Sequence, residues 1–439
     1  MAQSSSRKPT LLGFSSSDAR ELAEDRKRFT IDGREPREVI FPGSVGQVSG
    51  ALRSASEQQL AVAPVGLGAF LQLGGRPRRY DLALSLQRLN RIVDYQPTDM
   101  TVTVEAGMTL ARLQEILGEH GQWLPIDPPV PEKATIGGVI AANLSGPARL
   151  SQGTIRDFLI GLKVVQADGT VIKGGGRVVK NVAGYDLPKL YCGSFGTLGV
   201  IVEATFKVRP RSQAQEILSL GFPSAEKAME RTLRLLSSEL QPFFLELTNF
   251  DPAQAHGSAT TSYFLFVGLA GLAEEVSYQR AHIRSLVGGG ESVSKEEEGG
   301  HTLGSTLQNF PVSGAAVLRC KATLLPTHVA GFCKEVAQEA TLRGLSVQLL
   351  AHAGNGIVYS RFLHPDNISQ QQLLSLVDWL RILAKKLGGY VVVEDVTPAL
   401  KDRVDVWGHV GNAFPLMKKL KETLDPKGIL NPGRFVGEI

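Results

Sequence analysis

The residues whose types and spacing suggest chemistry are glycines, which gather in three clusters. The first is Gly-Leu-Gly at 66–68, directly after an apolar run at 60–65 that is typical of a short strand. Glycines let backbone N–H groups approach an anion closely, which suits a pyrophosphate. A Rossmann turn would need a third glycine and a long helix, whereas Leu71 holds the third position and the run 73–77 breaks any helix. Taken alone, this cluster fits an ordinary tight turn at least as well.

The second cluster is a run of small residues at 135–146, with Gly137 and Gly138 near its start. These two glycines can open a helix whose first N–H groups face a ligand, and the small residues after them allow close approach to a flat ring. The third cluster spans 180–187 and 193–201, where a glycine-rich turn leads into a β-branched strand. Such a turn can offer backbone groups to an adenine or flavin edge. The alternative for each cluster is a turn in which glycine only marks the end of an element.

The order of these motifs resembles the FAD-binding domain of the vanillyl-alcohol oxidase and p-cresol methylhydroxylase family. The motifs are Pro-x-Gly-x-Gly at 64–68, Thr-Ile-Gly-Gly-x-x-Ala-x-Asn at 135–143, Lys-Asn-x-x-Gly-Tyr-Asp-Leu at 180–187 and Gly-Thr-Leu-Gly-Val-Ile at 196–201. The closing run at 424–435 is similar to the end of that family, where the chain returns to the flavin domain. Four motifs in order are far more specific than any one of them.

Within the family, the run at 174–186 and the Asp-Val-Trp-Gly segment at 405–408 look most like the FAD-binding subunits of bacterial glycolate oxidase complexes. In such complexes a second flavoprotein subunit and an iron–sulfur subunit complete the electron path. The resemblance therefore implies these two partners and a supporting role in the conversion of glycolate to glyoxylate. It also implies that any membrane association runs through the partners. A stand-alone FAD-dependent dehydrogenase for another 2-hydroxy acid is the alternative.

The resemblance implies FAD contacts residue by residue. They are Pro64, Val65, Gly66, Leu67, Gly68, Ala69 and Phe70 around the pyrophosphate; Ala134, Thr135, Gly137, Gly138, Ala141 and Asn143 beside the isoalloxazine and pyrophosphate; and Phe195, Gly196, Thr197, Leu198, Gly199, Val200 and Ile201 at the adenosine and ring region. Ala69 and Phe70 stand where the family usually has Thr or Ser, so hydroxyl hydrogen bonds to phosphate are lost there. No His or Cys lies in the usual attachment segments, which implies non-covalent FAD.

The catalytic residues of the family's 2-hydroxy-acid members are only partly present. Oxidation of a 2-hydroxy acid needs a cation for the carboxylate, a base or metal for the hydroxyl proton and a flavin for the hydride. Those members carry His-x-Gly-Asp-Gly-Asn-x-His, of which this chain keeps His352 but has Asn355 and Tyr359 in place of the Asp and the second His. A later Glu-His-Gly reads Glu-Asp-Val here, with Asp395 at the His position. A metal site built from several imidazoles is therefore not expected.

Four side chains remain as catalytic candidates. Arg319 lies on one expected strand and Arg361 on another, and either guanidinium could grip a carboxylate. A surface salt bridge is the commoner fate of an arginine. His352 alone fits a structural, hydrogen-bonded histidine as well as a base. Tyr359 is a weak base unless its pKa is strongly lowered, and Arg361 shares its face of the strand.

Composition excludes several classes of protein. The chain has 439 residues, 43% hydrophobic and 21% charged, which predicts two large domains of an ordinary globular protein. Its net charge of +4 comes from Lys and Arg spread along the chain, so no nucleic-acid surface is expected. Three cysteines without close pairing argue against disulfides, zinc and iron–sulfur clusters, and fit the reducing cytoplasm.

Targeting signals are weak. No apolar run reaches the roughly 18 residues of a membrane span. The first residues lack an apolar signal core, and their serines with Arg7 and Lys8 only faintly suggest a transit peptide. A disordered terminus is the simpler reading.

The elements that position the glycine clusters predict an α+β domain. Strands are expected at 60–65, 82–86, 101–106, 159–166, 170–173 and 200–208, and helices at 18–28, 43–55 and 110–121. The Ala-Asp-Gly turn at 167–169 predicts a hairpin.

Beyond an Arg-Pro-Arg run at 209–211, two units follow with the order strand, helix, strand, strand, helix. They span 215–287 and 315–387, and a strand at 390–394 closes the series. We interpret them as one antiparallel sheet covered by helices, forming a cap domain. The expected division is an N-terminal segment at 1–37, a two-part p-cresol methylhydroxylase-type FAD-binding domain at 38–212, a cap or substrate-type domain at 213–423 and a return to the FAD domain at 424–439.

Overall fold

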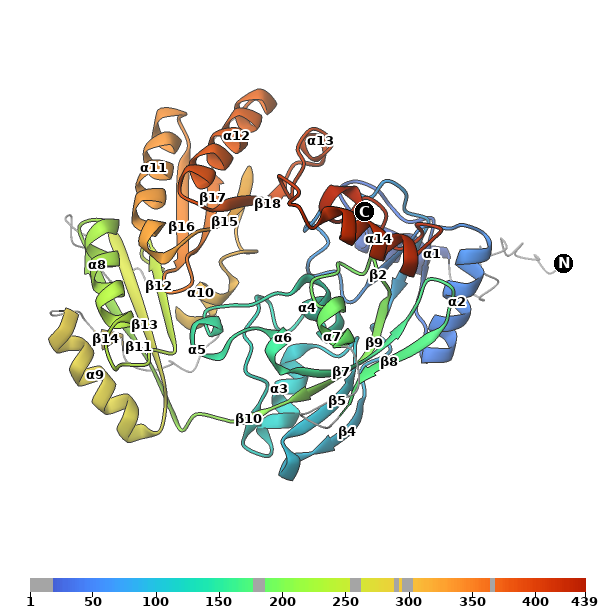
Figure 1. Ribbon diagram of the computed structural model, residues 1–439, viewed down its shortest axis with the longest axis horizontal. Helices are drawn as coiled ribbons and strands as arrows, with labels where there is room; N and C mark the ends of the chain where they lie inside the picture. Colours follow the sequence, from blue (N-terminus) through green and yellow to red (C-terminus); the bar gives the residue numbers. More distant parts are fainter. Residues whose placement is uncertain (1–18, 177–185, 253–261, 288–291, 294–302, 364–367) are drawn as a thin grey trace.

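The computed structural model describes residues 19–176, 186–252, 262–287, 292–293, 303–363 and 368–439. Two mixed bodies of helices and strands lie side by side, and the C-terminal residues join the N-terminal body (Figure 1). The expected α+β class is confirmed. The suggested transit peptide and residues 180–185 of the third motif lie outside the described residues.

A small parallel sheet opens the N-terminal body. In sheet order, its strands are β1 (Glu38–Ile40), β3 (Leu82–Ser85) and β2 (Val62–Val65). Helix α1 (Ala19–Arg28) precedes the sheet, and helix α2 (Val45–Glu57) begins after Ser44, whose hydroxyl accepts a hydrogen bond from the N–H of Gln47. The buried side chains of α2 recur every three to four residues and enter the core beneath the sheet.

Five antiparallel strands form the second sheet of this body. In sheet order they are β4 (Ile92–Gln96), β5 (Thr101–Glu105), β9 (Val200–Lys207), β7 (Leu159–Val165) and β8 (Val171–Gly175). The expected hairpin joins β7 and β8, with Gly169 at a φ of 86° in its turn. The sequence did not predict β4, because this edge strand is partly exposed and lacks a clean alternation of apolar and polar residues. One apolar core joins the two sheets.

Short elements connect these sheets. They are η1 (Pro97–Asp99), α3 (Leu110–Gly118), β6 (Gln122–Trp123), α4 (Ile136–Ala142), α5 (Arg149–Gln152), α6 (Ile155–Phe158), α7 (Leu187–Tyr191) and β10 (Arg209–Pro210).

The central part of the chain forms one eight-stranded antiparallel sheet. In sheet order, its strands are β14 (Ser292–Val293), β11 (Ala214–Phe222), β13 (Tyr263–Gly271), β12 (Phe244–Thr248), β16 (Ser346–His352), β17 (Ile357–Leu363), β15 (Leu318–Thr323) and β18 (Tyr390–Val396). The two expected units are present: β11-β13-β12 of the first lie beside β16-β17-β15 of the second, in reversed order. Strands β12 and β16 join the units.

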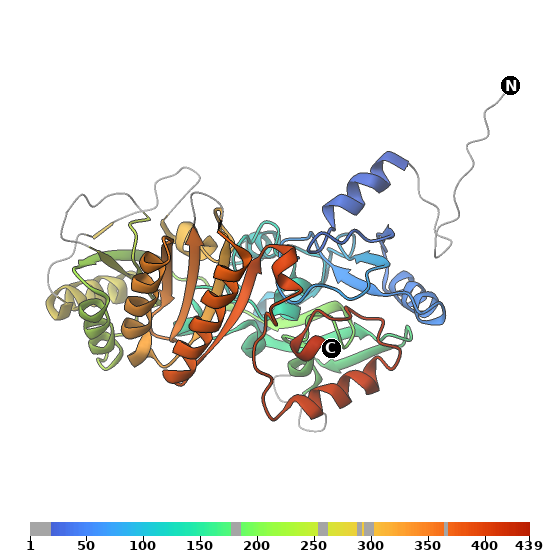
Figure 2. The same cartoon turned by 90° about the horizontal axis from the view of Figure 1, so that it is seen from above.

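Helices cover one face of the cap sheet (Figure 2). They are α8 (Ala225–Leu236), α9 (Ala273–Val287), α11 (Val329–Leu342, after the short η2, Pro326–His328) and α12 (Gln370–Lys386). Helix α12 begins after Ser369, which forms a capping box with Gln372. The expected start at Asn367 lies outside the described residues.

The other face of the cap sheet meets the N-terminal body. It carries an aromatic cluster that includes Phe266 and Tyr359 and is covered by α10 (Leu303–Asn309). The side chain of Asn309 accepts a hydrogen bond from the N–H of Val130 at 2.7 Å, and Gln308 donates one to the carbonyl of Pro128 at 2.8 Å. The segment before α4 is therefore fixed to the cap.

The chain then returns to the N-terminal body through α13 (Pro398–Lys401), α14 (Phe414–Leu424) and η3 (Val436–Glu438). Val62 on β2 donates to the carbonyl of Ile429 at 2.7 Å and accepts from the N–H of Asn431 at 2.9 Å. These bonds place residues 429–431 beside the strand that leads into the first glycine cluster.

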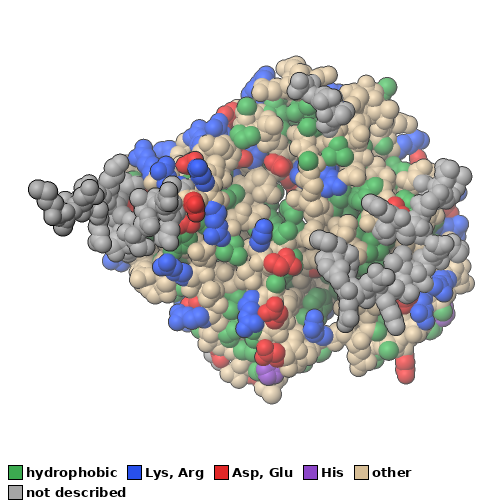
Figure 3. Space-filling view, turned by 180° about the vertical axis from the view of Figure 1, so that it is seen from behind, with side chains coloured by type: hydrophobic (Ala, Val, Ile, Leu, Met, Phe, Trp, Pro, Cys, Tyr) green, Lys and Arg blue, Asp and Glu red, His purple; other side chains and the backbone are tan. Residues whose placement is uncertain are grey.

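One face of the molecule shows no single dominant charge. On the face drawn in Figure 3, basic and acidic side chains are interspersed. Among the helices that the structure describes, none has both the length and the apolar character needed to cross a membrane.

Candidate functional site

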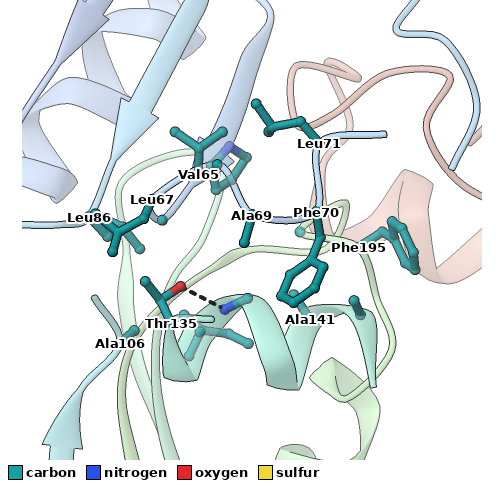
Figure 4. Close-up of a pocket in the computed structure, with 18 of the residues that line it drawn as sticks. Val65, Leu67, Ala69, Phe70, Leu71, Leu86, Ala106, Thr135, Ala141 and Phe195 are labelled. Atoms are coloured by element: carbon teal, nitrogen blue, oxygen red, sulfur yellow. Dashed lines mark hydrogen bonds between the residues drawn. The ribbon is translucent and has the colours of Figure 1, made fainter. Parts of the chain in front are cut away.

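A pocket opens where the three glycine clusters meet (Figure 4). Its walls are the segment after β2, helix α4 and the turn before β9. The residues expected at FAD that line it are Pro64, Val65, Gly66, Leu67, Gly68, Ala69, Phe70, Thr135, Gly137, Gly138, Ala141, Phe195, Gly196, Gly199 and Ile201. Three of the four sequence motifs, at 64–68, 135–143 and 196–201, therefore converge on one place, although they lie up to about a third of the chain apart.

Five of the expected residues do not line this pocket: Ala134, Asn143, Thr197, Leu198 and Val200. Ala134 and Val200 are wholly buried in the apolar core. The hydroxyl of Thr197 donates to the carbonyl of Ser194 at 2.7 Å, and the side-chain oxygen of Asn143 accepts from the thiol of Cys192 at 3.4 Å. These residues therefore support the segments that line the pocket without lining it themselves.

Seven lining residues were missed by the sequence reasoning: Leu71, Leu86, Ala106, Lys133, Ala142, Asn431 and Arg434. Asn431 and Arg434 belong to the closing run that resembles the family, so a signal for them existed. The others are mostly apolar positions at element ends, which only the fold brings to the pocket.

The loop of the first cluster presents unused backbone donors. Within the described ranges, the N–H groups of Leu67, Gly68, Ala69 and Phe70 donate no hydrogen bond to the protein. Gly68 has a φ of 84°, a conformation that favours glycine. A Cβ on Gly66 would lie 2.2 Å from the hydroxyl of Thr135, so only glycine lets this loop approach α4. Free amides on a tight loop are a suitable site for an anion.

Helix α4 forms as expected, but its first N–H groups do not face a ligand. The N–H of Ile136 donates to the carbonyl of Met108 at 2.8 Å, and the N–H of Gly137 to the carbonyl of Ala106 at 2.7 Å. Gly138 donates to the hydroxyl of Thr135, the residue that caps the helix. The expectation that these N–H groups face a ligand is therefore wrong, because the protein itself satisfies them.

One buried cation reaches the pocket wall. Arg434 is 5% exposed and donates to the carbonyls of Gly75 and Leu71, both at 2.9 Å. Burial lowers the pKa of Arg434 to about 10, so its guanidinium remains charged near neutral pH. The indole of Trp407 donates to the carbonyl of Arg434 and packs edge-on against Phe195, with 4.8 Å between ring centroids.

The residues present fit the expected cofactor. The free amides and the arginine suit a pyrophosphate, and the apolar walls with Phe195 suit a flat ring. None of the described residues that line the pocket is His or Cys, the residue types expected for a covalent attachment.

A second group of polar residues lies on the cap-sheet face that meets the N-terminal body. The Nδ1 atom of His352 and the Oε1 atom of Glu246 lie 2.7 Å apart, and both side chains are almost wholly buried. Their other polar atoms, His352 Nε2 and Glu246 Oε2, have no hydrogen-bond partner in the described part of the chain. The ring of Tyr359 stands edge-on to His352 at 5.3 Å. Glu246 gave no sequence signal, because it is a lone acid on an apolar strand.

Both candidate arginines are engaged by one loop. Arg319 donates to the carbonyls of Ser313, at 2.7 Å, and Gly314, and lies 3.7 Å from Asp395. Arg361 donates to the carbonyl of Ser313 at 2.5 Å and to the side chain of Gln348. These bonds fix the 313–314 turn. They use N–H groups of both guanidinium groups, so neither has all of its donors available to bind a substrate carboxylate.

Burial also shifts the acids and the phenol of this group. It raises the pKa of Tyr359 well above its usual value, so the phenol is not a base near neutral pH. It raises the pKa of Asp127 to about 7, and it raises the pKa of Glu246 and of Glu394. In the described residues, no group of three or more His, Cys, Asp or Glu side chains is placed to hold a metal ion.

Comparison with known proteins agrees with this geometry. Residues 36–175 match the FAD binding domain family, and residues 211–435 match the C-terminal domain of FAD linked oxidases. The second match covers more than half of the chain, so the chain belongs to the FAD-linked oxidase family. It is an FAD-dependent oxidoreductase, and the expected family resemblance and cofactor are confirmed.

Individual relatives refine the comparison. Glycolate oxidase subunit GlcD of Bacillus subtilis is 28% identical over 91% of this chain and 89% of its own length. Glycolate oxidase subunit GlcE of Escherichia coli is 30% identical over 79% of this chain and 85% of its own length. D-lactate dehydrogenase of Archaeoglobus fulgidus is 27% identical over 97% of both chains.

A solved structure of alkyldihydroxyacetonephosphate synthase superposes with a TM-score of 0.71 at 19% identity, covering 92% of this chain and 78% of that one. At this identity the likeness concerns the fold alone.

Proposed function

We propose that this chain is the FAD-binding subunit of a glycolate oxidase or dehydrogenase complex, in which it supports the conversion of glycolate to glyoxylate. A second flavoprotein subunit and an iron–sulfur subunit are its proposed partners. The support is its similarity to two proteins named as glycolate oxidase subunits and to a D-lactate dehydrogenase, all of which act on 2-hydroxy acids by name.

In this proposal the described pocket holds FAD without a covalent bond. The free amides of 67–70 and the guanidinium of Arg434 bind the pyrophosphate, and Thr135, Ala141 and Phe195 contact the rings. When bound, FAD supplies the acceptor for a hydride and a store of two electrons. The chain itself orients the cofactor and excludes water from one side of it.

One observation favours a supporting subunit over a complete catalyst: three of the four candidate catalytic groups are engaged in other bonds or have an unsuitable pKa. Arg319 and Arg361 both hold the 313–314 turn, and burial raises the pKa of Tyr359. A positioned acid–base group typically contributes about 10²–10⁴-fold to the rate. We therefore propose that the chain serves electron relay or assembly and lacks a complete substrate site.

The alternative function, a stand-alone 2-hydroxy-acid dehydrogenase, has one specific observation in its favour. The pair formed by Glu246 and His352 leaves the imidazole Nε2 without a partner, which is the arrangement of a carboxylate that orients a histidine base. A competent base would still need a cation for the substrate carboxylate.

Anaerobic stopped-flow spectroscopy distinguishes the two functions. The FAD-loaded chain is mixed with glycolate or D-lactate, and flavin absorbance is followed. We expect no rapid bleaching from the isolated chain. Bleaching at tens per second that is abolished by His352→Ala or Tyr359→Phe would make this chain a catalyst in its own right.

A cytoplasmic location belongs to the same proposal, with membrane contact only through the partners. It is supported by the three cysteines, all of which are free thiols.

A further inference from the structure

We propose that Asp32, Lys401 and Arg434 form a buried charge triad whose excess positive charge attracts the pyrophosphate of the cofactor. The inference rests on the proposed FAD site, and it adds residues from three distant segments to that site. Asp32 precedes β1, Lys401 ends α13 after the cap, and Arg434 lies in the C-terminal return.

Close contacts join the three side chains. The Nζ atom of Lys401 lies 2.8 Å from Oδ1 of Asp32, and Nη1 of Arg434 lies 3.5 Å from Oδ2 of the same carboxylate. The Lys401 side chain is 0% exposed and the Asp32 and Arg434 side chains are each 6% exposed. The triad is therefore shielded from water. Charges in such a buried environment are screened less and act over longer distances than charges in water.

The triad also holds the chain that continues the phosphate loop. Lys401 donates to the carbonyls of Gln72 and Gly74, and Arg434 donates to those of Leu71 and Gly75. Residues 71–75 directly follow the free amides of 67–70. The excess charge thus lies behind the loop that offers donors to an anion.

The charge balance of the triad is uneven: two cations share one carboxylate. A further acid that acts on Lys401 is Asp395, which is paired with Arg319. Hydrogen bonds to residues 71–75 give both cations a structural role, but carbonyl groups carry no net charge, so the charge of the second cation is not neutralised within the triad. An excess positive charge behind an anion-binding loop raises affinity for a pyrophosphate.

This arrangement accounts for the missing hydroxyls of the loop. Ala69 and Phe70 cannot donate side-chain hydrogen bonds to a phosphate, yet both line the pocket. Long-range attraction from the triad replaces those short-range bonds.

The test changes the net charge of the triad in steps. Lys401→Met removes the excess charge, and the double variant Lys401→Met with Asp32→Asn restores it by also removing the carboxylate. Asp32 has a φ of 48°, a conformation that asparagine tolerates well. Dissociation constants are measured by fluorescence titration for FAD and for riboflavin, which carries the same ring without phosphates.

We expect Lys401→Met to weaken FAD binding about tenfold to hundredfold, with riboflavin affinity unchanged within about twofold. The double variant should recover most of the FAD affinity. Arg403→Met, which removes an exposed cation two residues along the chain, is the matched control and should change neither constant.

Three outcomes would overturn the inference. They are equal losses for FAD and riboflavin, no recovery in the double variant, or no loss in Lys401→Met. If Lys401→Met does not fold, Asp32→Asn alone decides: tighter FAD binding supports the triad, and equal or weaker binding contradicts it. If the unaltered chain binds no FAD in this pocket, the proposed function fails. If FAD binds but its dissociation constant does not change with the net charge of the triad, only this inference is refuted.

Discussion

At Gly68 two separate factors restrict which side chain is tolerated: the backbone conformation and the negative charge of the proposed ligand. Its φ of 84° restricts side chains, although Asn and Asp tolerate this region better than most residues. A carboxylate here would also stand next to the free amides that are proposed to meet the pyrophosphate. The two effects can be separated by a matched pair of variants.

We expect Gly68→Asp to weaken FAD binding about tenfold or more relative to Gly68→Asn, because the two side chains have the same size and differ in charge. A flavin titration of both variants measures the difference. Equal affinities would move the phosphate site away from this loop.

The residues that sequence reasoning found and missed differ in kind. Gly66 could be predicted because its close approach to Thr135 leaves no room for a Cβ, so the position requires glycine and is visible as a motif in the sequence. Glu246 could not be predicted as a site residue, since a single charged side chain gives no pattern until the fold buries it. Arg434 lies in the closing run that resembles the family, so a signal for it existed and was missed. Arg319 and Arg361 gave a plausible pattern, but the structure uses their donors to hold a turn.

At the scale of elements, the periodicity of buried residues was the strongest signal. Helix α12 buries Leu373, Leu376, Val377 and Leu380, a spacing that predicts one covered face. The two-unit cap sheet followed from element order alone. Strands β1 and β4 were missed, because one is only three residues long and the other is a partly exposed edge.

The helix α4 shows where a local pattern misleads. Two glycines after Thr135 predicted both the helix and free donors at its start, and only the helix is present. The carbonyls of Ala106 and Met108, brought from the end of β5 by the fold, take up the donors. The loop at 67–70 is therefore the proposed anion site, as the family resemblance of its glycine motif implied, whereas the motif taken alone fitted a tight turn equally well.

At the scale of the whole molecule, the incomplete set of catalytic groups and the similarity to oxidase subunits both favour a heteromeric complex. We expect the chain and the co-expressed products of neighbouring genes to elute together from a size-exclusion column. Light scattering of the eluted species should give a mass larger than that of the chain alone. Co-expression of the chain with an unrelated flavoprotein is the control. A chain that remains separate from these neighbours at micromolar concentration would contradict the proposed assembly.

The central claim is that the pocket between the 64–71 segment, α4 and the turn before β9 holds FAD without a covalent bond. The direct measurement is the absorption spectrum of the purified chain after incubation with FAD, before and after treatment with acid or denaturant. We expect a flavin spectrum at about one FAD per chain, lost entirely to the supernatant when the protein is precipitated. A folded chain with no flavin absorbance, or a flavin that stays with the precipitate, would contradict the account.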